Sequence, residues 1–216
     1  MDGGMYDHPA TQANLATLRQ RGVLLAGPAE GRMASGLSGL GRMLEPADLL
    51  GEARRVLARD GVLRGRRVVV TTGPTREALD PVRYISNRST GKQGIAVAQA
   101  ALDAGADVTL IAGPVAEAAP YGARLIAVET TQQMGEAVLS CVGDADALLM
   151  VAAVADFRPE SVADRKIKKT ESADWGLAIG LEKTLDILSA VKEQRDRTGF
   201  PRVVLGFAAE THNAFE

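Results

Sequence analysis

From Arg66 onward, short apolar runs alternate with stretches in which apolar residues recur at helical spacing. Apolar runs that predict strands lie at residues 68–72, 106–113, 124–130, 146–154, 177–182 and 202–210. Helical patterns separate these runs at residues 90–104, 131–142 and 184–196. Near-continuous apolar strands are typical of parallel sheets whose two faces are covered by helices. The pattern therefore predicts an α/β fold with a doubly wound, mostly parallel, Rossmann-like sheet.

The first 63 residues have a different pattern. Residues 10–21 and 46–59 are expected to be helical, and the apolar residues 23–27 predict one short strand. The four glycines within residues 31–43 predict a loop. Because one strand without a partner is not stable alone, we do not expect this segment to form an independent domain.

Composition and charge narrow the class of protein. A formal net charge of −2 provides no overall field that would attract nucleic acid or an anionic membrane, so an anionic ligand must be bound by a local site. Cys141 is the only cysteine, which excludes an internal disulfide and favours a reducing compartment. The chain has no signal-peptide pattern and no apolar run near the roughly 20 residues of a membrane span. We expect a cytoplasmic protein that binds small molecules, and neither nucleic acid nor membrane.

Ligands of open parallel sheets bind beyond the carboxyl ends of the strands, near the point where the strand order changes. A dinucleotide fingerprint would need GxGxxG after the first strand, but that turn contains only Gly73, and the second strand does not end in an acidic residue. A P-loop would need GxxxxGK followed by Ser or Thr, but Gly91-Lys92 is followed by Gln93. These failures count against a nicotinamide-dependent reductase, which is one alternative function.

The segment SNRSTGKQG leads into the helix expected at residues 90–104. Ser89 or Thr90 is expected to cap this helix, and Gly91 and Gly94 would let a ligand approach the backbone. Free N–H groups at a helix N-terminus bind anions, and the helix dipole adds to this. An ordinary capped turn would give the same pattern.

Further polar residues follow the first and fourth predicted strands. Asn87 can donate to an oxyanion or stabilise a turn, and Asp80 with Arg83 can form a loop ion pair. The KIKK segment, residues 166–169, carries three ammonium groups that can cover a triphosphate or form a solvated surface. The Asp156 carboxylate can hold a magnesium–phosphate complex or cap a turn.

The segments GPTREALDPVRYISNRSTGKQG, VAAVADFRP, KIKK and GFAAET, in this order and spacing, resemble phosphopantothenate–cysteine ligases. The resemblance covers about residues 65–216, and in bacteria this ligase is commonly fused behind a flavin-dependent phosphopantothenoylcysteine decarboxylase. The family continues past GFAAET with further strands and basic residues. The resemblance therefore implies an incomplete CTP-binding ligase domain at residues 64–216, truncated at its C-terminus.

Residues 1–45 resemble the end of the decarboxylase, so residues 1–63 are expected to be its tail plus a linker. MDGGMYDHPATQANL is similar to the substrate-binding MNxxMW segment, and GRMASGLSGLGRM to the flap. Asp2, Tyr6 and Ser35 stand where the pattern has Asn, Trp and Cys. Because a serine hydroxyl is far less acidic than a thiol, we do not expect this chain to decarboxylate. FMN is expected only in the decarboxylase part that would precede Met1.

The resemblance implies a step in coenzyme A biosynthesis. The carboxylate of 4′-phosphopantothenate would attack the α-phosphate of CTP, and the amine of L-cysteine would then displace CMP. CTP with Mg²⁺ is the expected cosubstrate, although other branches of the family use ATP, and the ligase domain is expected to be a homodimer. A fragment that binds nucleotide without turnover is the second alternative.

The resemblance assigns a role to each site residue. Asn87 and Lys166 are expected to be catalytic. The substrate-binding residues would be Arg83, Asn87 and Ala153, and the metal-binding residue would be Asp156. The nucleotide-binding residues would be Gly73, Ser89, Thr90, Gly91, Asp156, Lys166, Lys168, Lys169, Phe207 and Ala208.

Overall fold

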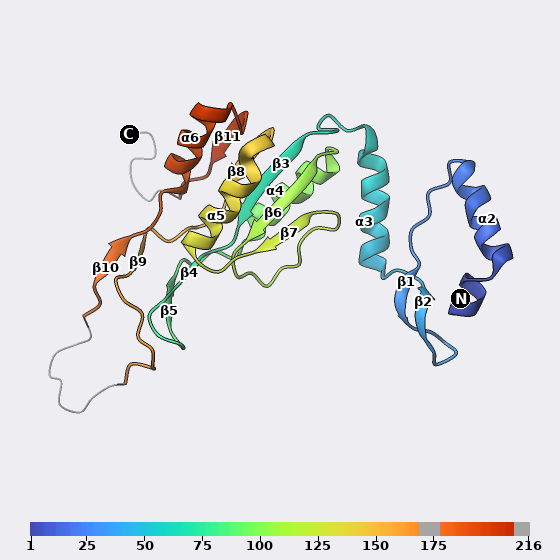
Figure 1. The fold of residues 1–216 in the computed structure, drawn as a ribbon, viewed down its shortest axis with the longest axis horizontal. Helices are drawn as coiled ribbons and strands as arrows, with labels where there is room; N and C mark the ends of the chain where they lie inside the picture. The colour runs from blue at the N-terminus through green and yellow to red at the C-terminus, as the bar shows by residue number, and fades with distance from the viewer. Residues whose placement is uncertain (169–177, 210–216) are drawn as a thin grey trace. The chain divides into compact units, whose positions relative to one another are not determined.

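The structure is a computed structural model that describes residues 1–168 and 178–209 (Figure 1). Contacts between residues divide the chain into two units, Met1–Val56 and Leu57–Glu216. Lys169 and the residues after 209, for which we made predictions, lie outside the described residues. Within residues 1–168 and 178–209, none of the helices is long and apolar enough to cross a membrane.

The second unit is built on a parallel sheet which, in the described residues, has five strands in the order β11–β8–β3–β6–β7 (Figure 1). Its strands are β3 (Arg67–Thr72), β6 (Asp107–Ala112), β7 (Arg124–Ala127), β8 (Ala147–Met150) and β11 (Val203–Gly206). The chain proceeds from β3 outward to β6 and β7, then returns to the other side of β3 for β8 and β11. The doubly wound prediction is confirmed. The order reverses between β3 and β8, where such sheets bind ligands.

Helices cover both faces of this sheet, as predicted. They are α4 (Lys92–Asp103) on one face and α5 (Thr131–Cys141) and α6 (Ile187–Thr198) on the other, with short 3₁₀ turns η1 (Ala58–Asp60) and η2 (Val142–Asp144). Side chains of a strand alternate between faces. Val68 and Val70 therefore pack against Ala98 and Ala101 of α4, while Val69 belongs to the apolar cluster on the opposite face. That second cluster includes Met134, Val138, Ile187 and Val191.

Helix α4 approaches β3 closely at Gly94. A Cβ atom added there would lie 2.5 Å from Thr72 Cβ and 2.9 Å from the Thr71 carbonyl oxygen. We expected Gly94 to leave room for a ligand. This expectation is wrong, because the neighbouring strand already fills the space beside it.

Replacing Gly94 with alanine is expected to lower the free energy of unfolding by about 1–3 kcal/mol, because the methyl group overpacks the helix–strand contact. Alanine otherwise favours a helix over glycine, so a loss of stability would report the clash. Gly143→Ala is a matched control, since its Cβ would meet only Gln194 Nε2 at 3.6 Å. Thermal unfolding measures both variants. An unchanged or higher melting temperature for Gly94→Ala would contradict the packing described here.

Two antiparallel pairs lie outside the parallel sheet. Strand β4 (Arg76–Ala78) pairs with β5 (Tyr84–Ser86), and β9 (Phe157–Pro159) pairs with β10 (Leu181–Lys183). We predicted that a strand at residues 177–182 belongs to the parallel sheet. For the described residues of this range, that prediction is wrong, because their strand β10 pairs with β9. Strand β8 has β3 and β11 on its two sides, so β10 pairs instead with the segment that follows β8.

The strand predicted at residues 146–154 is shorter than expected and ends at Met150. The amides of Val151 and Ala152 both donate to the Thr71 hydroxyl, at 3.2 Å, instead of continuing the ladder. A side chain of the neighbouring strand therefore ends β8.

The first unit contains α1 (Gly3–Tyr6), α2 (Pro9–Gln20), the strands β1 (Ala29–Arg32) and β2 (Ser38–Arg42), and all but the last residue of α3 (Pro46–Leu57). The two predicted helices are confirmed. The strand predicted at residues 23–27 and the loop predicted at residues 31–43 are wrong, because β1 and β2 pair as an antiparallel hairpin. Gly36 closes its turn at φ +86°, a conformation that glycine adopts without steric cost. The glycines of residues 31–43 are therefore part of a hairpin.

Candidate functional site

The turns after β3 and β8 meet at the carboxyl edge of the sheet. Gly73 follows β3 with φ +78°, and its carbonyl oxygen accepts a 2.9 Å hydrogen bond from Ala153 N. Pro74 and Ala153 form an isolated parallel bridge. A Cβ atom at Gly73 would lie 2.6 Å from Val115 Cγ1, so a larger residue would push this turn away. The structure thus brings together Gly73 and Ala153, which the sequence placed in the site separately.

Two buried threonines at the end of β3 hold the loops on either side. The Thr71 hydroxyl accepts the amides that end β8, and the Thr72 hydroxyl donates a 2.7 Å hydrogen bond to the Gly91 carbonyl. Both side chains are fully buried. Sequence reasoning missed them. The available signal was a pair of hydroxyl residues at the end of an apolar strand, directly before a glycine.

A second buried group of polar side chains lies beside the turns after β3 and β8. Thr75 Oγ1 accepts the Ala155 amide at 3.0 Å and lies 3.1 Å from Thr131 Oγ1. The Thr131 amide and hydroxyl both donate to Glu77 Oε1 at 2.8 Å. Because Thr131 begins α5, the Glu77 carboxylate lies where the helix dipole favours a negative charge. These buried partners, also missed from the sequence, join the backbone after β8 and the start of α5 to the segment that follows β3.

Asn87 bridges the same two loops. Its Nδ2 donates 3.0 Å hydrogen bonds to the carbonyl oxygens of Ala153 and Val154. The neighbouring Ser86 hydroxyl donates to the Thr75 carbonyl at 2.7 Å. Asn87 is exposed, and its amide is turned toward the β8 loop.

The start of α4 differs from the prediction. Gly91, not Ser89 or Thr90, is the N-cap, with φ +77° and no side-chain cap. The Gly91 carbonyl is held by Thr72, and its left-handed conformation is one that glycine adopts readily. Ser89 Oγ accepts the amide of the N-cap residue Gly91 at 3.3 Å. Ser89 was expected to bind an amide inside the helix, which begins only at Lys92.

The KIKK segment, residues 166–169 and below called the basic segment, is joined through Ile167 to the tip of the β4–β5 hairpin. The Ile167 amide donates to Asp80 Oδ2 at 3.1 Å, and Arg83 Nη2 donates to the Ile167 carbonyl at 2.7 Å. The Asp80–Arg83 ion pair is present, with 2.6 Å between Oδ2 and Nη2. Lys166 and Lys168, on either side of Ile167, are exposed.

Asp80 is a buried carboxylate, 2% exposed. The Arg83 guanidinium holds the pKa of Asp80 well below its usual range, and the amides of Val82, Ile167 and Arg83 act in the same direction against the effect of burial. The side chain is therefore ionised whenever the protein is folded near neutral pH.

The remaining predicted residues lie near the ends of β8 and β11. The Phe207 amide donates to the Met150 carbonyl at 3.0 Å, and the side chain is 45% exposed, followed by exposed Ala208. Asp156 is exposed, and its carbonyl accepts the Thr184 amide at 3.0 Å. Among the described residues, no three His, Cys, Asp or Glu side chains form a group that could hold a metal ion.

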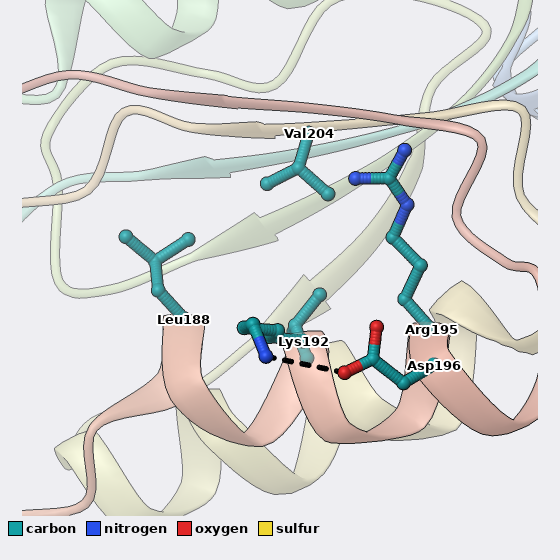
Figure 2. A pocket seen from close by; sticks show the side chains of 6 residues that line it. Leu188, Lys192, Arg195, Asp196 and Val204 are labelled. Carbon is teal, nitrogen blue, oxygen red and sulfur yellow. Dashed lines mark hydrogen bonds and ion pairs between the residues drawn. The ribbon is translucent and has the colours of Figure 1, made fainter.

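Two cavities lie away from these residues. One, of 320 Å³, lies between α6 and β11 (Figure 2) and is lined by Leu188, Val191, Lys192, Arg195, Asp196 and Val204. An ion pair of 3.2 Å joins Lys192 and Asp196 at its rim. The other, of 680 Å³, lies at the amino edge of the sheet, and its lining includes Arg67, Asp107, Arg124 and Cys141. Neither cavity is lined by a predicted site residue. The predicted residues that the structure brings together, Gly73, Asn87 and Ala153, lie at the carboxyl edge of the sheet, which is therefore the candidate site.

The chain is similar to known proteins along its length. A curated relative from Vibrio vulnificus (strain YJ016), named coenzyme A biosynthesis bifunctional protein CoaBC, is 43% identical over 213 residues, which cover 99% of this chain and 52% of the relative. The protein of that name from Mycobacterium tuberculosis (strain H37Rv) is 46% identical over 217 residues, which cover 97% of this chain and 51% of the relative. The chain thus spans about half the length of the curated relatives it matches.

A solved structure supports the same relationship. The C-terminal domain of coenzyme A biosynthesis bifunctional protein CoaBC superimposes with a TM-score of 0.59 at 40% identity, covering 70% of this chain and 68% of that one. The family model described as DNA/pantothenate metabolism flavoprotein C-terminal domain matches residues 63–216. Since this match covers more than half of the sequence, the chain belongs to the family of DNA/pantothenate metabolism flavoprotein C-terminal domains.

Proposed function

We propose that the chain carries the ligase part of a coenzyme A biosynthesis enzyme, which joins 4′-phosphopantothenate to L-cysteine at the expense of CTP. The main support is the arrangement of the β4–β5 hairpin. Its base, through Asn87, contacts the β8 loop at the strand-order reversal, and its tip binds the basic segment at Ile167. A relative named for coenzyme A biosynthesis is 43% identical to this chain over 99% of its length.

The proposed reaction has two steps. A carboxylate oxygen of phosphopantothenate attacks the α-phosphorus of CTP, the bond to the bridging oxygen breaks, and pyrophosphate leaves. The cysteine amine then attacks the acyl carbon, loses a proton and displaces CMP. Such chemistry needs positioning and charge neutralisation more than a protein nucleophile, which fits a site of amides, lysines and asparagine.

On the nucleotide side, the Lys166, Lys168 and Lys169 ammonium groups would cover the triphosphate. The first turn of α4 has no side-chain cap, so its amides can donate to a phosphate, and the helix dipole adds to this. The nucleotide pocket would be completed by Gly73, Ser89, Thr90, Gly91, Phe207 and Ala208. Exposed Phe207 offers a ring against which a base can stack.

A magnesium ion would fit only as a partner of the nucleotide. Asp156 contributes one exposed carboxylate, and Mg²⁺ commonly combines one or two carboxylates with substrate phosphates and waters. When bound, the ion would neutralise phosphate charge. The protein's contribution would be to hold the carboxylate of Asp156 beside the β8 loop.

On the substrate side, Arg83 would bind the terminal phosphate of phosphopantothenate. Its side chain is 41% exposed, so the guanidinium can contact a phosphate while it also pairs with Asp80. Asn87 would donate to the acyl-phosphate oxygens beside Ala153. To do so, its amide must exchange one of its two carbonyl partners for the ligand.

The domain assignment completes the proposal. Residues 1–63 would be the tail of a flavin-dependent decarboxylase plus a linker, residues 64–216 the ligase domain, and two ligase domains would form a homodimer. FMN would belong to the decarboxylase part. Ser35 donates a hydrogen bond to the Asp2 carboxylate, so two of the departures from the decarboxylase pattern contact each other.

Incubating the intact protein with CTP, phosphopantothenate and L-cysteine is expected to release pyrophosphate and give 4′-phosphopantothenoylcysteine. ATP in place of CTP tests the choice of nucleotide, and omission of cysteine should leave the acyl-cytidylate on the enzyme. CTP binding without any product would favour the binding-only alternative. Binding of NADPH in place of CTP would favour the reductase alternative.

A further inference from the structure

The backbone between the two described lysines of the basic segment is held at both of its polar groups. The Ile167 amide donates to Asp80 Oδ2, and the Ile167 carbonyl accepts from Arg83 Nη2. One ion pair thus binds the donor and the acceptor of a single residue. The chain just before this segment is attached to the same hairpin, since the Ala163 amide donates to the Leu79 carbonyl at 3.0 Å.

Asp80 is the centre of this arrangement. Its Oδ1 accepts the amides of Val82 and Arg83 at 2.8 Å, and its Oδ2 accepts Arg83 Nε, Arg83 Nη2 and the Ile167 amide. A buried charge is costly unless donors surround it, and here donors bind both carboxylate oxygens. The lowered pKa of Asp80 means that the tether persists as pH falls to the usual carboxyl range, and is lost only in stronger acid.

We infer that Asp80 is a positioning residue that fastens Ile167 to the β4–β5 hairpin and so sets where Lys166 and Lys168 stand at the tip of that hairpin. The inference rests on the proposed function, in which these lysines bind the triphosphate. Lysine side chains are long and flexible, so a fixed backbone reduces the ordering that the ligand must impose. Asp80 carries a negative charge and donates no hydrogen bond, so it acts on the nucleotide through the lysines.

A merely structural role would have a different signature. If Asp80 only stabilised the fold, its loss would lower the melting temperature and reduce the fraction of active protein, leaving the CTP affinity of the folded fraction unchanged. A positioning role predicts weaker CTP binding in folded protein. It also predicts faster hydrogen exchange at the Ile167 amide, because that amide loses its acceptor.

The test compares Asp80→Asn with Asp146→Asn in the intact protein. Asp146 is a suitable control because its carboxylate also accepts a backbone amide, Arg67 N at 2.9 Å, and an arginine, Arg66, at the opposite edge of the sheet. We expect Asp80→Asn to raise the Kd for CTP at least about tenfold and to speed Ile167 exchange by a similar factor. Asp146→Asn should change neither quantity. Calorimetry and hydrogen-exchange mass spectrometry measure them without turnover.

A second pair of variants covers the case in which Asp80→Asn does not fold. Ile167→Pro removes the amide that Asp80 accepts while leaving the Asp80–Arg83 pair, and Ile167→Val keeps that amide. The proline variant should weaken CTP binding, and the valine variant should not. Wild-type CTP affinity in Ile167→Pro, or wild-type Ile167 exchange in folded Asp80→Asn, would overturn the inference. Wild-type protein that binds CTP but makes no product would instead contradict the proposed function, and the affinity comparison would still stand.

Discussion

Replacing Lys166 with glutamine is expected to slow pyrophosphate release from CTP about 10²–10³-fold, the usual loss when a donor to a developing negative charge is removed. Glutamine preserves much of the length of lysine but carries no charge, so it cannot neutralise the triphosphate. Lys166 is exposed, so the melting temperature should stay close to that of the wild type. Pyrophosphate release in the intact protein, at saturating phosphopantothenate, is the measurement.

Lys192→Gln is the control for this prediction. Lys192 is also exposed and forms an ion pair with Asp196 on α6, and it contacts none of the proposed site residues in the hydrogen bonds and ion pairs described above. This variant should keep wild-type turnover. Equal rates for Lys166→Gln and wild type would remove Lys166 from the catalytic group.

Replacing Asn87 with aspartate is expected to reduce amide formation about 10²–10³-fold, with a smaller loss in pyrophosphate release. The Asn87 amide donates to two carbonyl oxygens at 3.0 Å, and an aspartate carboxylate would face those oxygens with no hydrogen to donate. The loop junction would open, and the acyl-phosphate would lose its donor. The acyl-cytidylate should therefore accumulate, which rapid quenching and mass spectrometry can detect.

Asn14→Asp in α2 controls for the added negative charge, because Asn14 is exposed and lies in the first unit. It should leave both half-reactions unchanged. An equal decline of pyrophosphate release and amide formation in Asn87→Asp would contradict a role in the second step. Unchanged turnover in both Lys166→Gln and Asn87→Asp would remove the proposed site altogether.

The strands and helices of the parallel sheet could be predicted because burial on both faces leaves a clear pattern. The run at residues 68–72 became the central strand, since apolar side chains are needed on both of its faces. The wrong secondary-structure predictions concern segments that are not buried on both faces. The glycines of residues 31–43 indicate a loop by composition, but they close and pair a hairpin. The short strand Leu181–Lys183 has no burial pattern at all, because all three of its residues are exposed.

Topology explains why some of the predicted residues meet. Residues just after the strands of a parallel sheet gather at one edge, and Gly73 and Ala153, which come after β3 and β8, do so. Asn87 comes after β5, outside that sheet, and reaches Ala153 through a side-chain hydrogen bond. The threonines were missed because their partners are distant in sequence. Thr71 binds the amide of Val151, 80 residues later, and no local pattern encodes such a pairing. The tether between Asp80 and Ile167 spans 87 residues and was missed for the same reason.

The threonine pair at the end of β3 also limits where this domain can change length. Thr71 and Thr72 point to opposite faces, and each holds a different loop. One residue inserted within β3 would turn every following side chain to the other face, so each threonine would lose its loop at once. The exposed residues 116–118, between β6 and β7, have no such alternation to keep. Insertions accepted by this domain should therefore be found there and absent from β3.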